Sequence, residues 1–304
     1  MPSFYGAFNI DSDGMYREAL LAAGYAEVCD PFKSDFIVHD AVHPNLGPYL
    51  QSRPNFIVPH TPQSSFMWDG ILPIDIPPAC NFVYGQAGCD VMAAYRYPYR
   101  VEAIGFSRCE VREFEPTRGA DLLIIPSHSL QHGEYTYSDY IDRAVSVLAH
   151  VLKYQYAFGR IVLCWNETRF DPALMNAMRE TGFIIIPTNP NIDKDPLKRM
   201  MGRIEQANLV MACGTAGCVS VAMGKPTVFM TETNQARSNP RDALHSELYI
   251  HHLRFPLAVE DMTIEEILAV RRAPNEKVEL WKERNIGGSF NAEKFIGIIR
   301  EYVG

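Results

Sequence analysis

The chain has 304 residues, of which 47% are hydrophobic and 21% are charged, a composition typical of a globular protein able to bury a full core. Its net charge of -8 argues against indiscriminate binding to nucleic acid or to anionic lipid surfaces. No segment approaches the roughly 20 apolar residues of a membrane-spanning helix, and the first residues lack the pattern of a signal peptide. We therefore expect a cytoplasmic protein of one large or two medium domains.

The cysteines are scattered, and none form a C-x-x-C pair. They stand at positions 29, 80, 89, 109, 164, 213 and 218. Most lie within apolar runs, which is typical of buried free thiols in a reducing compartment. Their pattern favours a structural role over a metal or redox site.

In the first half of the chain, short apolar runs alternate with helix-like segments. The predicted elements are strand 3–8, helix 15–23, strand 35–38, a short helix near 44–52, strands 55–59 and 81–84, helix 87–94 and strand 100–105. This alternation is typical of βαβ units in a parallel sheet. The polar stretch 106–119, which has no clear period, is the predicted linker.

The second half repeats this alternation. Its predicted strands are 121–126, 160–165, 183–187, 209–213 and 227–230, and its predicted helices are 138–158, 172–181, 196–206 and 216–223. The strands are continuously apolar, as expected when helices cover both faces of a sheet. After a loop-rich stretch, Thr263 and Glu266 have the spacing of a capping box, which predicts the start of a helix. A final helix is expected near 292–302.

The simplest architecture for this pattern is an α/β protein with two facing Rossmann-like domains and an interdomain cleft. We place the first domain at residues 1–115 and the second at residues 116–304. The last helix is a candidate to pack back on the first domain.

A segment of small residues follows the strand predicted at 209–213, and it consists of Gly214, Thr215, Ala216 and Gly217. We interpret it as a turn that leads into the next helix. A turn at the carboxyl end of a parallel strand exposes backbone N–H groups, and the helix adds the positive end of its dipole, so that phosphates can be held without lysine. The alternative is that the glycines serve only the close packing of helix and strand.

Four segments of the chain resemble the GT-B class of glycosyltransferases in their order and spacing. They are residues 101–108, residues 207–217, Gly224-Lys225-Pro226 with the apolar strand after it, and residues 233–235 with 239–240. The pattern is most similar to the CDP-glycerol glycerophosphotransferases and the related non-hydrolysing UDP-sugar 2-epimerases. The resemblance implies that the second domain binds the nucleotide part of a sugar or polyol donor, that the first binds the acceptor, and that they react in the cleft between the domains.

The resemblance also implies roles for individual residues. The segment from Gly214 to Gly217 is expected to face the donor diphosphate, and Gln235 is expected to lie near the transferred group. Many members of the class carry a glutamate shortly before the Gly-x-Pro segment to hold the ribose, but here Val219 stands in that place. Glu232 is the candidate for a ribose contact instead.

The loop at residues 127–133 follows the first strand of the second domain and is rich in hydroxyls and imidazoles. Ser127 and His128 are predicted to contact the donor. His128 and His132 have the spacing of a pair of metal ligands on a helix, but no third ligand is apparent. We therefore predict no metal and no cofactor, with a nucleotide-diphosphate sugar or polyol as the donor substrate.

Transfer to a hydroxyl needs a base that takes the acceptor proton. Asp11 or Asp13, Asp40 and His60 follow strands of the first domain. His60 is the first choice for the catalytic base, because it lies between two prolines on a stiff loop and titrates near neutral pH. Asp11 is the reserve. The alternatives are a histidine that caps backbone groups and aspartates that serve as turn or helix-cap residues.

The leaving group of the donor needs compensation of its charge. Arg108, at the domain junction, and Arg237, in the loop after the last strand, are the candidates, although isolated arginines are often solvated surface residues.

The leading hypothesis is a glycosyltransferase-like enzyme that transfers a sugar or phosphopolyol from a nucleotide diphosphate donor to a hydroxyl acceptor on a glycan, a polyol or a modified DNA base. Three alternatives stay open: a phage-type DNA glycosyltransferase that acts on a hydroxymethylated base, a nucleotide-sugar epimerase or hydrolase, and a non-catalytic nucleotide-sugar binding protein.

Overall fold

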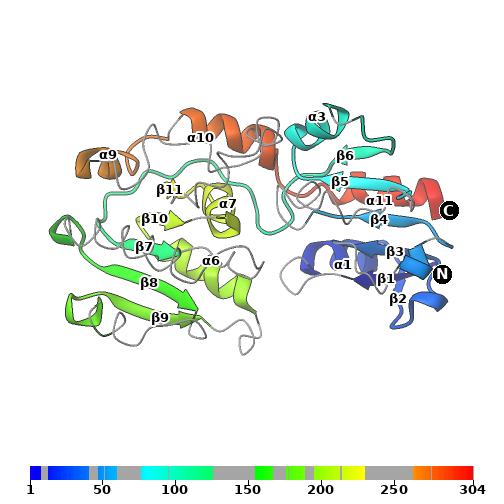
Figure 1. Ribbon diagram of the computed structural model, residues 1–304, viewed down its shortest axis with the longest axis horizontal. Coiled ribbons are helices and arrows are strands. Elements are labelled where there is room, and N and C mark those ends of the chain that lie inside the picture. Colours follow the sequence, from blue (N-terminus) through cyan, green and yellow to red (C-terminus); the bar gives the residue numbers. More distant parts are fainter. Residues whose placement is uncertain are drawn as a thin grey trace. The chain divides into compact units, whose positions relative to one another are not determined.

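The computed structural model consists of two compact units (Figure 1). Unit 1 comprises residues 1–111, 243–249 and 281–304, and unit 2 comprises residues 112–242 and 250–280. The residues that the structure describes are 1–7, 13–40, 47–50, 52–59, 77–94, 96–125, 155–166, 176, 178–188, 195–212, 214–229, 263–274 and 276–303. The first boundary between the units, after Val111, falls inside the polar stretch 106–119.

Unit 1 is built on a sheet of six strands that pair in parallel, in the order β2-β1-β3-β4-β5-β6 (Figure 1). The strands are β1 (Ser3–Ala7), β2 (Ala26–Glu27), β3 (Phe36–His39), β4 (Asn55–Ile57), β5 (Cys80–Val83) and β6 (Val101–Ala103). The strand order changes direction between β1 and β3, which makes this pair the topological switch point of the sheet.

Helices cover both faces of this sheet. On one face, α1 (Asp13–Ala22) and α11 (Ala292–Val303) share the main core of unit 1 with alternate strand residues such as Phe36 and Phe56. On the other, α2 (Gly47–Leu50) packs against Ile37 and its neighbours, and α3 (Gln86–Ala94) lies over β5 and β6. Because side chains alternate across a strand, a fully buried strand such as β3 serves both cores.

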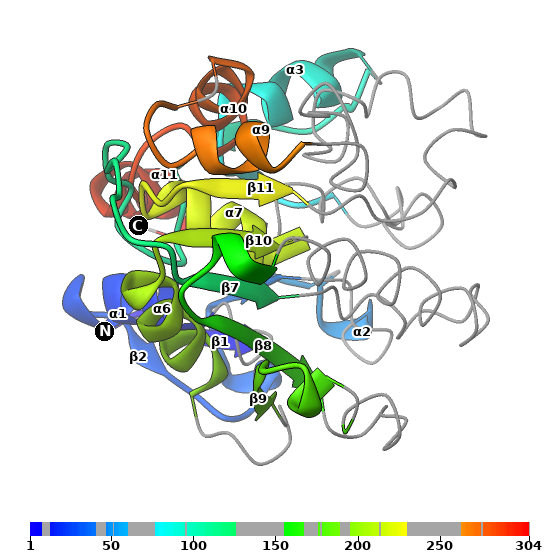
Figure 2. The ribbon, with the colours of Figure 1, turned by 90° about the vertical axis from the view of Figure 1, so that its left-hand side faces the viewer.

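Unit 2 has a sheet of five strands, all parallel to their neighbours, in the order β11-β10-β7-β8-β9. The strands are β7 (Leu122–Ile125), β8 (Ile161–Asn166), β9 (Ile184–Thr188), β10 (Leu209–Ala212) and β11 (Thr227–Phe229). Figure 2 shows the strands side by side in this order. The chain moves outward from β7 to β9 and then returns to the other side of β7 with β10, so the switch point lies between β7 and β10.

The helices of unit 2 have clear local signals. They are the short 3₁₀ helix η4 (Gln155–Ala157), α6 (Pro196–Gln206), α7 (Gly214–Ala222), α9 (Ile264–Ala269) and α10 (Glu276–Trp281). Asp195 caps α6 by accepting a hydrogen bond from Lys198 N at 3.0 Å, and a proline occupies the first helical turn. The capping box predicted for α9 is confirmed, with Glu266 N bonded to Thr263 Oγ1 and Thr263 N bonded to a Glu266 carboxylate oxygen.

The structure confirms the α/β class and parallel sheets, and it adds elements that were not predicted. These are β2, the 3₁₀ turn η1 (Pro31–Lys33), α10 and the π-helical segment η9 (Lys282–Ile286). The helix predicted at 138–158 lies largely outside the described residues, and of the one predicted at 172–181 residues 176 and 178–180 are described as helical. Among the helices described, none is long and apolar enough to cross a membrane.

Candidate functional site

The switch point of unit 2 coincides with the segments predicted to bind the donor. Gly214 begins α7 immediately after β10, and Ser127 and His128 follow β7 in the chain. Ser127 and His128 lie outside the described residues. In open α/β sheets, ligands bind beyond the carboxyl ends of the strands at the switch point. Both predicted segments therefore follow the two strands that flank this point.

The segment of small residues differs in one respect from the prediction. Gly214, Thr215, Ala216 and Gly217 form the first turn of α7 and not a separate turn before it, because the helix begins two residues earlier than expected. The helix is apolar along its length and carries no acidic residue in its first turn, and burial in the core overrides the low helix propensity of glycine. The free N–H groups of this turn and the helix dipole favour an anion at this end.

The body of α7 is buried in unit 2. Val219, which stands where the resemblance expects a ribose-binding glutamate, has no exposed surface, and it therefore faces the core. Glu232 and Gln235, the other predicted donor contacts, lie outside the described residues. Residues 216–222 of α7 are all buried, so no side chain in this part of the helix is free to contact a ribose.

The Gly-x-Pro segment at the other end of α7 has a structural role. Gly224 has a φ of 73°, and a Cβ at this position would overlap the carbonyl oxygen of Glu113. Glu115 N donates to Gly224 O at 2.8 Å, and Arg112 N donates to Ala222 O at 2.7 Å. The segment thus anchors the start of unit 2 against the end of α7, at the amino end of β11 and away from the carboxyl edge of the sheet.

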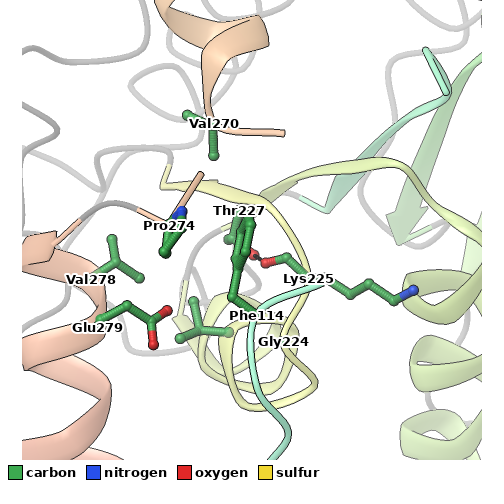
Figure 3. Close-up of a pocket in the computed structure, with 9 residues that line it drawn as sticks. Phe114, Gly224, Lys225, Thr227, Val270, Pro274, Val278 and Glu279 are labelled. Carbon is green, nitrogen blue, oxygen red and sulfur yellow. Dashed lines mark hydrogen bonds between the residues drawn. The ribbon is translucent and has the colours of Figure 1, made fainter. Parts of the chain in front are cut away.

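A small pocket opens beside this anchor (Figure 3). Its wall is mostly apolar, with Phe114 and Val278 among its residues, and its volume of about 10 Å³ is room for about one water molecule. Lys225 also lines it, but its ammonium group extends away from Glu279 (Figure 3) and lies 3.6 Å from a Glu115 carboxylate oxygen. The pocket is too small for a nucleotide.

At the carboxyl edge of the unit 1 sheet, the two preferred catalytic residues, His60 and Asp11, lie outside the described residues. Asp40 follows β3 directly and is buried, with 4% of its surface exposed. His39 is also buried, and its Nε2 lies 3.4 Å from Asn55 Oδ1. The structure therefore makes His39 a core histidine, and it places Asp40 beneath the surface of this edge.

Two buried tyrosines meet at this edge. Tyr84, just after β5, donates a hydrogen bond to the carbonyl oxygen of Pro59 at 2.9 Å, and Tyr16, on α1, donates to the same atom at 3.4 Å. The sequence contains no signal for this meeting, because the three residues are far apart in the chain and a tyrosine in an apolar pattern is usually a core residue.

Ser107 and Arg108, which come shortly before the boundary of unit 1 at Val111, both influence the Tyr16 hydroxyl. Burial raises the pKa of Tyr16 well above its usual value, the Tyr84 phenol acts in the same direction, and Ser107 and Arg108 act against it. Arg108 has 6% of its surface exposed, so this predicted compensating charge is buried in unit 1. Arg237 lies outside the described residues.

The part of the chain that the structure describes contains no metal cluster, and most of its cysteines are buried. No group of three His, Cys, Asp or Glu side chains there could hold a metal ion. Of the six cysteines described, only Cys29 is exposed. Burial raises the pKa of the Cys80 thiol to about 12, which keeps it protonated at neutral pH.

Comparisons with known proteins show the fold. No protein-family model matches the chain, and neither does any curated protein. UDP-GlcNAc 2-epimerase from Neisseria meningitidis, solved with UDP-GlcNAc bound, is similar with a TM-score of 0.57 and 10% identity over 99% of this chain and 100% of that one. The wall teichoic acid polymerase TagF is similar with a TM-score of 0.55 and its H548A variant with 0.56, each at 10% identity over 99% of this chain and 89% of that one. The chain therefore has the GT-B fold, with two Rossmann-like domains in one polypeptide.

Proposed function

We propose that this protein is a GT-B-type transferase that moves a sugar or phosphopolyol from a nucleotide diphosphate donor to a hydroxyl acceptor. The observation that carries the proposal is the position of the α7 N-terminus, with its first turn of small residues, at the switch point of the unit 2 sheet. Such a helix start holds a diphosphate through backbone N–H groups and its dipole. The structure of the similar Neisseria enzyme was solved with a nucleotide sugar bound.

In this proposal, unit 2 binds the donor. The diphosphate lies against the first turn of α7, and Ser127 and His128 contribute further hydrogen bonds from the loop after β7. Glu232 contacts the ribose, since Val219 is buried, and Gln235 lies beside the transferred group. Because α7 carries no acidic residue in its first turn, nothing on this turn repels the phosphates.

Unit 1 supplies the base. His60 takes the proton from the acceptor hydroxyl as its oxygen attacks, with Asp11 as the reserve. With a sugar donor, the bond between the anomeric carbon and the diphosphate breaks and the nucleoside diphosphate leaves. With a phosphopolyol donor, the diphosphate linkage breaks and the nucleoside monophosphate leaves. The α7 N–H groups and Arg237 compensate the charge of the leaving group. The buried Arg108 stabilises that charge through its electrostatic field, without direct contact.

The test is the dependence of donor turnover on the acceptor. Release of nucleotide from UDP, CDP, GDP, ADP and dTDP donors is measured without acceptor and with a glycan, a polyol or DNA that contains hydroxymethylated bases. The proposal predicts release that rises with one acceptor class and a product that carries the transferred group. Turnover without any acceptor would identify an epimerase or hydrolase, and donor binding without turnover would identify a binding protein.

A further inference from the structure

We propose that Tyr84 and Tyr16 are positioning residues, which hold the peptide group between Pro59 and His60 so that the loop after β4 begins from a fixed geometry. The inference rests on the proposed function, in which His60 is the base, and it adds the two side chains that determine where this base is attached to the sheet.

The carbonyl group of Pro59 receives its hydrogen bonds from side chains. The backbone pairing of β4 with β3 continues as far as Val58, whose N–H donates to His39 O at 2.9 Å. The Pro59 carbonyl lies one residue further along, and it accepts from the hydroxyls of Tyr84 and Tyr16 at 2.9 and 3.4 Å. A carbonyl has two lone pairs, so two donors can satisfy it. Side chains thus replace the sheet as partners of this carbonyl.

The planarity of the peptide group carries this restraint to the next residue. The carbonyl oxygen of Pro59 belongs to the same rigid plane as the backbone nitrogen and Cα of residue 60. The two hydrogen bonds to this oxygen therefore act on the peptide group that links Pro59 to the next residue. A proton transfer needs its heavy atoms within about 3 Å of each other. Such a restraint lowers the entropic cost of reaching that arrangement.

Both tyrosine rings are fixed by packing. Tyr84 has 2% of its surface exposed and packs edge-on against Phe106, with ring centroids 4.9 Å apart. Tyr16 has none exposed and packs against Phe290 and Phe295 at 5.2 and 5.6 Å. These contacts need only aromatic rings, and phenylalanine would fill the same space. The hydroxyls are therefore the part of each residue that ring packing alone does not require.

The hydroxyl of Tyr16 also stays protonated. Burial raises the pKa of Tyr16 well above its usual value, the nearby Tyr84 and Asp40 raise it further, and Ser107 and Arg108 lower it. At neutral pH the group is therefore a donor, as the bond to a carbonyl oxygen requires.

The test uses Tyr84→Phe, Tyr16→Phe and the double variant in the full chain. The control is Tyr25→Phe. Tyr25 is a buried tyrosine of the same unit, 6% exposed and packed against Phe36. The Tyr25 hydroxyl has no partner among the described residues. Two quantities are measured: the NMR titration of the His60 imidazole, assigned by its loss in His60→Ala, and the acceptor-dependent kcat with the KM for the donor.

Tyr84→Phe is expected to shift the His60 titration and to lower kcat about 5- to 10-fold, the factor that corresponds to one hydrogen bond, while the KM for the donor stays unchanged. The double variant should shift the His60 titration further and lower kcat more, and Tyr25→Phe should change neither quantity. A His60 titration that is the same in Tyr84→Phe, the double variant and the wild type would overturn the inference. If His60→Ala keeps full turnover, the proposed base is wrong, and the titration still decides whether the tyrosines hold the loop.

Discussion

Replacing Gly224 with alanine is expected to destabilise unit 2 by about 2 to 5 kcal/mol, in two parts. Gly224 has a φ of 73°, and an L-residue in that region costs about 1 to 2 kcal/mol. Its Cβ would also overlap the backbone oxygen of Glu113, and backbone cannot swing aside as a side chain can, so we add about 1 to 3 kcal/mol for the forced displacement. The hydrogen bond from Glu115 N to Gly224 O, 2.8 Å long, is strained by the same movement.

Gly182→Ala is the matched control for this variant. Gly182 lies in the same unit with a φ of 89°, and a Cβ there would meet nothing within 4 Å. Gly182→Ala should therefore lower the free energy of unfolding only by the cost of the positive φ, about 1 to 2 kcal/mol. Guanidinium unfolding followed by circular dichroism measures both free energies of unfolding. Equal losses for the two variants would refute the steric argument and leave the anchor at the end of α7 without support.

Three further outcomes are expected, two from described contacts and one from the proposed function. Thr227→Val removes a buried hydroxyl that bonds to the Ser220 side chain at 2.7 Å and to a backbone carbonyl at 2.8 Å. Unfolding curves should show that the free energy of unfolding falls by about 2 to 3 kcal/mol. An unchanged free energy would count against these bonds. At pH 8 a thiol reagent should label the exposed Cys29 well before Cys80, because Cys80, with a pKa of about 12, stays protonated; peptide mass spectrometry that finds Cys80 labelled as fast as Cys29 would contradict its burial. His60→Ala should lower the acceptor-dependent kcat by a factor of about 10² to 10⁴ without changing the Kd of the donor, and the same loss in Asp11→Ala alone would transfer the role of base to Asp11.

The local parts of the fold could be predicted from the sequence because their causes are local. The largely apolar strands β3 and β10 are buried and are not edge strands of their sheets, as their composition indicates. The helix α6 begins at Pro196, after its Asp195 cap, and α9 begins after the Thr263 capping box. In each case, neighbouring residues determine the boundary.

The features that were not predicted depend on contacts between distant parts of the chain. The strand β2 has only two residues, and it pairs with β1 without any apolar pattern of its own. The helix α7 begins at Gly214, two residues before its predicted start, although glycine has a low helix propensity. The Pro59 carbonyl obtains its donors from Tyr84 and Tyr16, and spacing along the sequence carries no information about that meeting.

The donor site can be tested before any acceptor is identified. Gly214→Asp places a carboxylate in the first turn of α7, where it complements the helix dipole but repels a phosphate. Gly202→Asp is the control, because Gly202 is exposed on α6 with open space around its Cα. Both variants are expected to fold as stably as the wild type.

The most direct measurement is the thermal unfolding midpoint of these three proteins with UDP, CDP, GDP, ADP and dTDP donors. A ligand that binds only the native state at 100 times its Kd stabilises it by about 2.7 kcal/mol. We predict that at least one donor raises the midpoint of the wild type and of Gly202→Asp by several degrees, and that it leaves Gly214→Asp unchanged. If no donor shifts the wild type, or if Gly214→Asp responds equally, the α7 N-terminus is not the donor site.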